Sequence, residues 1–177
     1  VGRMKFEGQK RIKDLLDGLA ALEGPWTLHA IGDGSDFEKC RRYASEKGIA
    51  DRITWHGWQA EPWTLVQRDI KRVSALLLTS SFEGFPMTLL EAMSYGIFCI
   101  SSDCMSGPGD MIVNGVNGQL YPPGDVSAFT AALSGFTRQP PVVDPATIQH
   151  SIHRFYIDAY FENVKAILRH ATETTIQ

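Results

Sequence analysis

The chain has 177 residues, 44% of them apolar, so it is about one domain long and can bury a sizeable core. Its 17 basic and 20 acidic side chains give a net charge of −3, which argues against a general nucleic-acid binder, whose affinity rests on neutralising phosphates. Residues 1–72 carry 13 basic and 11 acidic side chains, whereas residues 73–177 carry 4 and 9. An anion site is therefore expected in the front half.

Cysteines and histidines give no metal signature. The three cysteines, Cys40, Cys99 and Cys104, are too few and too irregularly spaced for a disulfide framework or a zinc site, and we expect buried thiols in a reducing compartment. His150 and His153 are three residues apart on an expected helix but have no third ligand. The longest nearly continuous apolar run, residues 73–78, is far shorter than the ~20 residues that span a bilayer.

Hydrophobic periodicity predicts strands and helices in alternation. Helices are expected from about residue 10 to 23 and over residues 36–47, 62–71, 86–95 and 125–136. Strands are expected at the amino terminus and over residues 27–31, 52–56, 73–79, 97–101 and 119–121. Such alternation predicts an α/β fold, a doubly wound parallel sheet of Rossmann-like type.

The predicted organisation has three parts. Residues 1–138 form the Rossmann-like domain, residues 139–147 are a proline-rich connection, and residues 148–177 form one terminal helix with an apolar stripe. This helix is expected to pack back on the domain or towards an amino-terminal domain. Because the chain starts with Val1-Gly2-Arg3 inside an expected strand, we interpret it as a piece of a longer protein.

Ligands of open parallel sheets bind beyond the carboxyl ends of the strands, so the loops there are the candidate sites. The turn Gly32-Asp33-Gly34 follows a strand, but the third glycine of a dinucleotide fingerprint is replaced by Phe37, and no acidic residue ends the next strand. A dehydrogenase-type domain is therefore disfavoured. The simpler interpretation is a tight turn that lets two backbones approach closely.

The loop after the fourth expected strand carries the strongest signal. Glu83 follows the strand, Gly84 allows an unusual backbone angle, and Pro86 fits a first helical turn. The amides that follow, of Met87, Thr88 and Leu89, are expected to point at an anion from the positive end of the helix dipole. One turn further, Glu91 is suited to accept hydrogen bonds from a diol. A phosphate cradle between two carboxylates suits a nucleotide sugar, although each carboxylate alone could be a solvated surface group.

Arg3 and Lys10 are the candidate diphosphate ligands, because both follow the first expected strand and an arginine can hold phosphate with two hydrogen bonds. The alternative is that Lys10, Arg11 and Lys13 form the solvated face of a helix.

Several of these stretches together resemble one known protein family. The chain looks like the carboxyl-terminal half of the retaining glycosyltransferases of family four, whose E-x7-E signature matches Glu83 and Glu91. The matching stretches cover residues 1 to about 136 and include residues 2–3, 8–10, 31–34, 56–58, 81–86, 90–93, 107–112 and 117–125. Residues 6–11, 32–40 and 101–108 are similar to family members that transfer galactose to the lipopolysaccharide core.

The resemblance implies a GT-B arrangement, in which two Rossmann-like domains face a cleft and this chain is the donor-binding half. It implies that Arg3 and Lys10 hold the donor diphosphate, that Glu91 binds the ribose and that Glu83 reaches the sugar hydroxyls. Glu83, Arg3 and Lys10 are thus the expected catalytic residues. The wider donor-binding set is Gly2, Arg3, Lys10, Gly57, Trp58, Gln59, Glu83, Gly84, Phe85, Met87, Thr88, Leu89 and Glu91, in which the loop of Gly57, Trp58 and Gln59 holds the base.

The resemblance further implies a donor such as UDP-galactose, no metal and no cofactor, and no nucleic-acid partner. The lipopolysaccharide core acceptor would bind through the amino-terminal domain, and the full-length protein would be cytoplasmic, peripheral at the inner membrane. The isolated domain is expected to be inactive. A non-catalytic nucleotide-binding regulatory module is the alternative, and the presence of Glu83 favours the enzyme.

Overall fold

The computed structural model describes the backbone of residues 1–174 and the side chains of residues 1–169; the last three residues of the expected terminal helix lie outside it. The strands are β1 (Leu28–Ile31), β2 (Ile53–Gly57), β3 (Ala75–Leu78), β4 (Phe98–Ser102) and β5 (Gly118–Tyr121). The helices are α1 (Ile12–Ala20), α2 (Phe37–Glu46), α3 (Pro62–Leu65), α4 (Met87–Ser94), α5 (Pro108–Met111), α6 (Val126–Arg138), α7 (Pro145–Ser151) and α8 (Ile157–Thr174). The 3-10 turns are η1 (Ala50–Arg52) and η3 (His153–Phe155), and η2 (Val66–Ile70) is a π-helical turn.

All strand pairs are parallel, which confirms the α/β fold class. The strands nevertheless form two sheets, β1–β2 and β3–β4–β5, where one sheet was expected. The expected amino-terminal strand is wrong for the described residues: residues 1–5 are not a strand. The amides of Gly2 and Met4 donate to the carbonyls of Ile31 and Asp33, both at 2.9 Å, so this segment lies beside the end of β1 and the turn that follows it.

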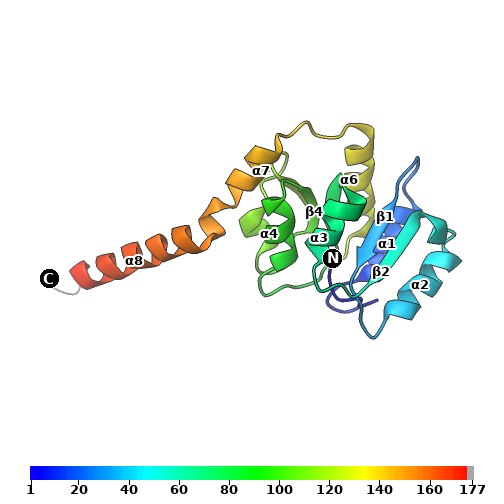
Figure 1. Cartoon of the computed structure of the whole chain (residues 1–177), viewed down its shortest axis with the longest axis horizontal. Helices are drawn as coiled ribbons and strands as arrows, with labels where there is room; N and C mark the ends of the chain where they lie inside the picture. The colour runs from blue at the N-terminus through cyan, green and yellow to red at the C-terminus, as the bar shows by residue number, and fades with distance from the viewer. Residues whose placement is uncertain (175–177) are drawn as a thin grey trace.

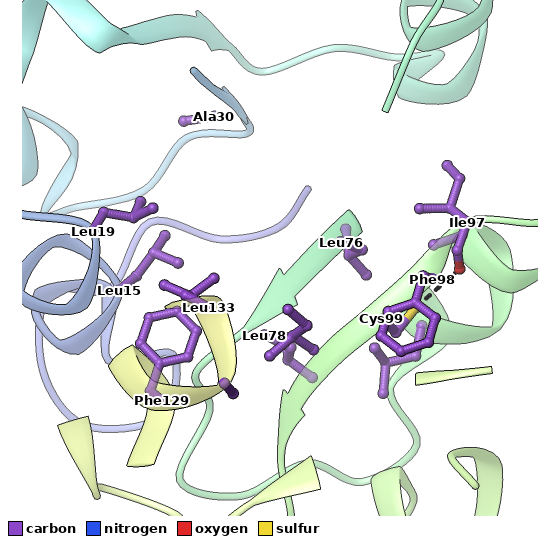
Figure 2. Packing of buried hydrophobic residues seen from close by; sticks show 14 of the residues in the cluster. Leu15, Leu19, Ala30, Leu76, Leu78, Ile97, Phe98, Cys99, Phe129 and Leu133 are labelled. Atoms are coloured by element: carbon purple, nitrogen blue, oxygen red, sulfur yellow. Dashed lines mark hydrogen bonds between the residues drawn. The ribbon is translucent and has the colours of Figure 1, made fainter. Parts of the chain in front are cut away.

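The core lies between the sheets and their covering helices (Figure 1). Leu15 and Leu19 of α1 lie beside Phe129 and Leu133 of α6, and all four are buried (Figure 2). The two helices approach closely at Gly18, where a Cβ atom would be 2.4 Å from the Phe129 ring. Every residue of β4 is buried, as the continuous apolar pattern of a two-sided strand requires.

The thiols are buried, as expected: Cys40, Cys99 and Cys104 are all inside the fold. Burial raises the pKa of Cys40 to about 11, and burial also raises the pKa of Cys99 and Cys104.

The expected single terminal helix is wrong, because the chain turns between α7 and α8. Asp144 caps α7 by accepting a hydrogen bond from the amide of Ala146. Ile148 and Ile152, the first residues of the expected apolar stripe, are buried in the core. Tyr156 is then extended and breaks the helix. Beyond it, α8 projects away from the body of the domain (Figure 1), and most of its large apolar side chains are exposed.

Candidate functional site

The site is built where β3 ends. There the turn formed by residues 8–11 is fastened to the loop after β3 by hydrogen bonds. Ser81 donates its amide to the carbonyl of Gln9 and its hydroxyl to that of Gly8, both at 2.8 Å, and the hydroxyl of Thr79 donates to the carbonyl of Lys10 at 3.0 Å. These bonds hold Lys10 beside the loop that carries Glu83, although the two residues are 73 positions apart.

Glu83 is held on one oxygen atom. Its Oε1 accepts a hydrogen bond from Nζ of Lys10 at 2.6 Å and another from the hydroxyl of Ser80 at 2.5 Å. The Glu83 side chain is 7% exposed and that of Lys10 is 20% exposed, so the pair is largely shielded from water. The interpretations of Glu83 as a solvated loop acid and of Lys10 as part of a solvated helix face are therefore wrong. Oε2 accepts no hydrogen bond from a described residue and is left to accept from a ligand.

The amino terminus of α4 is less open than expected. The amide of Met87 donates to the carbonyl of Phe85 at 2.8 Å, and that of Leu89 donates to the carbonyl of Pro86 at 2.9 Å. Of the three amides expected to face an anion, only that of Thr88 has no backbone acceptor among the described residues, as is usual in a first helical turn. Pro86 precedes the first helical residue and does not occupy it.

Gly84 does not use the left-handed conformation that a glycine allows. The φ angle of Gly84 lies outside the left-handed region, and a Cβ atom added there would meet nothing within 4 Å. The glycine that is needed on this side of the site is Gly107, with φ +107° and no room for a Cβ atom against Pro86.

Glu91 has a partner that the sequence did not reveal. Nε1 of Trp63 donates to Oε2 of Glu91 at 2.7 Å, and the Trp63 ring stacks on Tyr95 with centroids 5.2 Å apart. Ser80 and Trp63 are thus the two site residues that sequence reasoning missed. The position of Ser80 near Glu83 at a strand end could have indicated it as a site residue. For Trp63 the sequence offered only the preceding Pro62, which indicates where the helix starts and not what Trp63 contacts.

The expected base-binding loop lies directly after β2. Gly57 has φ +65°, Gln59 donates to the carbonyl of His56 at 2.9 Å, and the Trp58 side chain is 72% exposed. Within the described chain, none of the three makes a hydrogen bond or ring contact with Glu83 or Glu91. This loop therefore follows a strand of the β1–β2 sheet, whereas Glu83 follows a strand of the β3–β4–β5 sheet, and the structure does not join the loop to the carboxylates.

Gly2 and Arg3 lie against the turn after β1. A Cβ atom at Gly32 would be 1.9 Å from the Gly2 carbonyl oxygen, and one at Gly34 would be 2.5 Å from that of Met4. This confirms that the turn Gly32-Asp33-Gly34 serves close backbone approach. The Arg3 side chain is exposed and forms no ion pair with any described residue, so its guanidinium is available to an anion.

No three metal-ligating side chains come together among the described residues. In the same part of the chain, no helix has the length and apolar character to cross a bilayer. Arg3, Lys10 and Trp63 are among the residues that line a cavity of about 670 Å³, but neither Glu83 nor Glu91 borders it. Glu83 and Glu91 therefore lie outside this cavity, which is lined by residues of both sheets.

Residues 1–144 match the family model of glycosyl transferases, group 1. A curated relative, the lipopolysaccharide 1,6-galactosyltransferase of Escherichia coli, is 58% identical over 168 residues, which cover 95% of this chain and 47% of the relative.

Two solved structures are similar. The apo form of the lipopolysaccharide outer core galactosyltransferase WaaB has a TM-score of 0.93 and 58% identity over 96% of this chain and 48% of that one. The Anabaena protein HepE in complex with UDP has a TM-score of 0.79 at 20% identity, which shows the fold alone, over 95% of this chain and 48% of that one. The chain spans about half the length of the proteins it matches. It belongs to the group 1 glycosyltransferase family, and its fold is that of a Rossmann-like domain of a GT-B enzyme.

Proposed function

We propose that the chain is the donor-binding half of a glycosyltransferase that moves galactose from UDP-galactose, with retention, onto the lipopolysaccharide core. The observation that carries this is the shielded Glu83, fixed by Lys10 and Ser80 with one oxygen free, in a chain 58% identical to a lipopolysaccharide 1,6-galactosyltransferase. A carboxylate held in this way is oriented before the donor arrives, so it can bind a sugar hydroxyl without further ordering.

In the proposed complex the diphosphate is bound by Arg3 and Lys10. A lysine ammonium has three donors, so Lys10 can keep its hydrogen bond to Glu83 and give the others to phosphate oxygens. Arg3, which has no carboxylate partner among the described residues, can bind phosphate with two hydrogen bonds. Together they offset the charge that develops on the leaving diphosphate, and we expect no metal to be needed.

The two carboxylates divide the rest of the donor between them. Glu91 accepts from the ribose hydroxyls, with Trp63 holding one of its oxygens. Glu83 accepts from the hexose, and the loop of Gly57, Trp58 and Gln59 lies beside the base.

The acceptor and the groups that orient it belong to the other half of a two-domain cleft, and the full-length protein works at the cytoplasmic face of the inner membrane. Without that half the reacting atoms are not held together, so we expect the isolated chain to bind UDP without transferring sugar. The assay compares this chain with the full-length enzyme on UDP-galactose and galactose-deficient lipopolysaccharide, and NMR of the product reads its anomeric configuration. Transfer by this chain at the full-length rate would contradict the proposal, and binding without transfer by the full-length protein would favour a regulatory module.

Ligand binding tests the roles of the two carboxylates. Calorimetric competition among UDP-galactose, UDP-glucose and GDP-mannose should rank UDP-galactose first. Glu91→Gln should weaken UDP, UMP and uridine alike, whereas Glu83→Gln should weaken only ligands that carry a sugar on the diphosphate. Equal losses of UDP and UDP-galactose affinity in Glu83→Gln would show that the division of roles is wrong.

A further inference from the structure

The segment from α7 to η3 is fastened to the part of the domain that carries the two carboxylates. α7 lies beside α4, the helix of Glu91 (Figure 1). Nε2 of Gln149 donates to the carbonyl of Ser94, the last residue of α4, at 3.0 Å. The side-chain amide of the fully buried Asn117 donates to the hydroxyl of Ser151, the last residue of α7, at 2.7 Å. The end of α7 is therefore fixed in position, and η3 starts from a defined place.

η3 places an aromatic ring against the loop after β3. The rings of Phe155 and Phe85 meet edge to face, with centroids 5.8 Å apart and 62° between their planes, an arrangement that aromatic pairs favour. The guanidinium of Arg154 lies over the Phe155 ring, 4.7 Å from its centroid, and donates a hydrogen bond to the carbonyl of Asp110 in α5. η3 thus contacts both the loop after β3 and α5.

The backbone between Glu83 and Phe85 has little other support. The amide of Glu83 donates to the carbonyl of Met105 at 3.4 Å, which is long for a hydrogen bond. A Cβ atom at Gly84 would meet nothing within 4 Å, so no described residue packs on that side of the glycine. Phe85 is 46% exposed, and its ring contact among the described residues is the one with Phe155.

Phe85 lies between the two carboxylates of the site. It follows Glu83 by two residues, and its carbonyl accepts the amide of Met87, the first residue of α4, at 2.8 Å. Because α4 is also held by α7, a shift of Phe85 acts mainly on the backbone at Glu83. A loop that is ordered before a ligand arrives does not have to be ordered on binding, so support of Phe85 increases affinity for whatever Glu83 binds.

We propose that Phe155 is a positioning residue for the donor site: its ring packs on Phe85 and holds the backbone at Glu83 in the conformation in which that carboxylate meets the hexose. The role of Glu83 is taken from the proposed function, so this proposal rests on it. Residues 1–144 match the family model, so Phe155 lies outside the matched part. A residue of the carboxyl-terminal segment thereby contributes to donor binding without contacting the donor.

The test replaces Phe155 in the full-length protein. Phe155→Ala removes the ring, whereas Phe155→Tyr keeps it. The matched control is Tyr160→Ala, because Tyr160 is an exposed aromatic residue of α8 whose ring contacts Phe161 and not the loop. Hydrogen exchange is measured by mass spectrometry over residues 82–90 and, as a report on the stability of the fold, over α6. Calorimetry measures the affinities for uridine and UDP-galactose.

We expect Phe155→Ala to speed exchange over residues 82–90 at least about threefold, while exchange over α6 stays unchanged. The affinity for UDP-galactose should fall about tenfold, because the loop is no longer ordered before the donor arrives, and the affinity for uridine should not change. Phe155→Tyr and Tyr160→Ala should behave like the parent protein.

Unchanged exchange over residues 82–90 in Phe155→Ala would overturn the proposal. So would a rise that α6 shares, which is the sign of a general loss of stability, and equal losses of uridine and UDP-galactose affinity, which would place the effect away from Glu83. An unchanged affinity for UDP-galactose despite faster exchange would also overturn it. If the parent protein binds no UDP-galactose, the proposed function fails, whereas exchange still decides whether Phe155 holds the loop.

Discussion

The β3–β4–β5 sheet is packed more completely than the β1–β2 sheet. All five residues of β4 are buried, whereas β1 buries only Ala30 and Ile31 and β2 only Ile53. The difference follows from the neighbours of each sheet, because β4 has a strand on both sides and β1 has the cavity on one side.

The comparison bears on the site, because the two sheets carry different parts of it. Glu83, Ser80 and the turn that holds Lys10 are fastened to the end of β3, the well-packed side. Arg3 and the loop after β2 belong to the other side, next to the turn Gly32-Asp33-Gly34. A ligand that contacts both groups would bridge the sheets, so its affinity depends on how firmly they are joined.

The largest expected effect is on the free energy of unfolding, when either of two neighbouring leucines of α1 is shortened to alanine. Leu16 is fully buried away from the cavity, whereas Leu15 borders it. Leu16→Ala should lower the free energy of unfolding by about 4 kcal/mol and Leu15→Ala by about 2 kcal/mol, because Leu15 already lacks contact partners on its cavity side. Urea titration measures both. Equal losses would mean that the space beside Leu15 is packed as tightly as the core around Leu16.

The next effect concerns the ion pair that fixes Glu83. Lys10→Ala should weaken UDP binding by about 1.5 to 3 kcal/mol, the range for a hydrogen bond to a charged group, and reduce its salt dependence. The matched control is Lys13→Ala, because Lys13 also forms a 2.6 Å ion pair, with Asp17, but has no place in the proposed site. Calorimetry should find the control's affinity for UDP unchanged. An unchanged affinity in Lys10→Ala would remove Lys10 from the diphosphate site.

Elements were predictable from the sequence where one local signal dominated. The helix starts near Asp125 and Pro62 and the buried strand before Glu83 follow from capping residues, proline placement and continuous apolar runs. The split into two sheets was not predictable, because strand pairing depends on residues far apart in the sequence. The break in the helix at Tyr156 was not predictable for a related reason. The helical spacing of apolar residues continues through Tyr156, and only the packing of α7 shows where the helix stops.

The site was predictable in its charged residues but not in their partners. Glu83 follows β3 and Glu91 lies on α4, as their sequence positions indicate, whereas Arg3 and Lys10 follow a segment that was expected to be a strand and is not one. The hydrogen bond from Trp63 to Glu91 joins residues 28 positions apart and depends on how α3 lies against α4.

A smaller effect tests that hydrogen bond. Trp63→Phe keeps an aromatic ring for stacking on Tyr95 but removes the Nε1 donor to Glu91. We expect UDP and uridine binding to weaken by the same amount, about 0.5 to 1.5 kcal/mol, because Glu91 acts on the ribose that both ligands share. Trp55→Phe is the control, since Trp55 of β2 contacts Phe37 of α2 and not Glu91. Loss of UDP affinity with uridine affinity intact would place the effect of Trp63 on the diphosphate.

The smallest effect concerns the joint between β1 and β2, where Nδ1 of His29 and Nε2 of His56 are 2.9 Å apart. Burial, and after it the neighbouring His29, lower the pKa of His56 below 6.5 in the folded state, so between that lowered value and 6.5 the unfolded chain binds more protons. Stability should therefore fall as the pH is lowered through this window and level off below it. The change is small because the pair is exposed to solvent, which screens it. Urea midpoints of the parent chain and of His56→Gln, measured from pH 7.5 down to about pH 5, isolate the contribution of His56. If both chains lose stability equally over that range, the pH dependence arises elsewhere and the histidine pair does not couple β1 to β2.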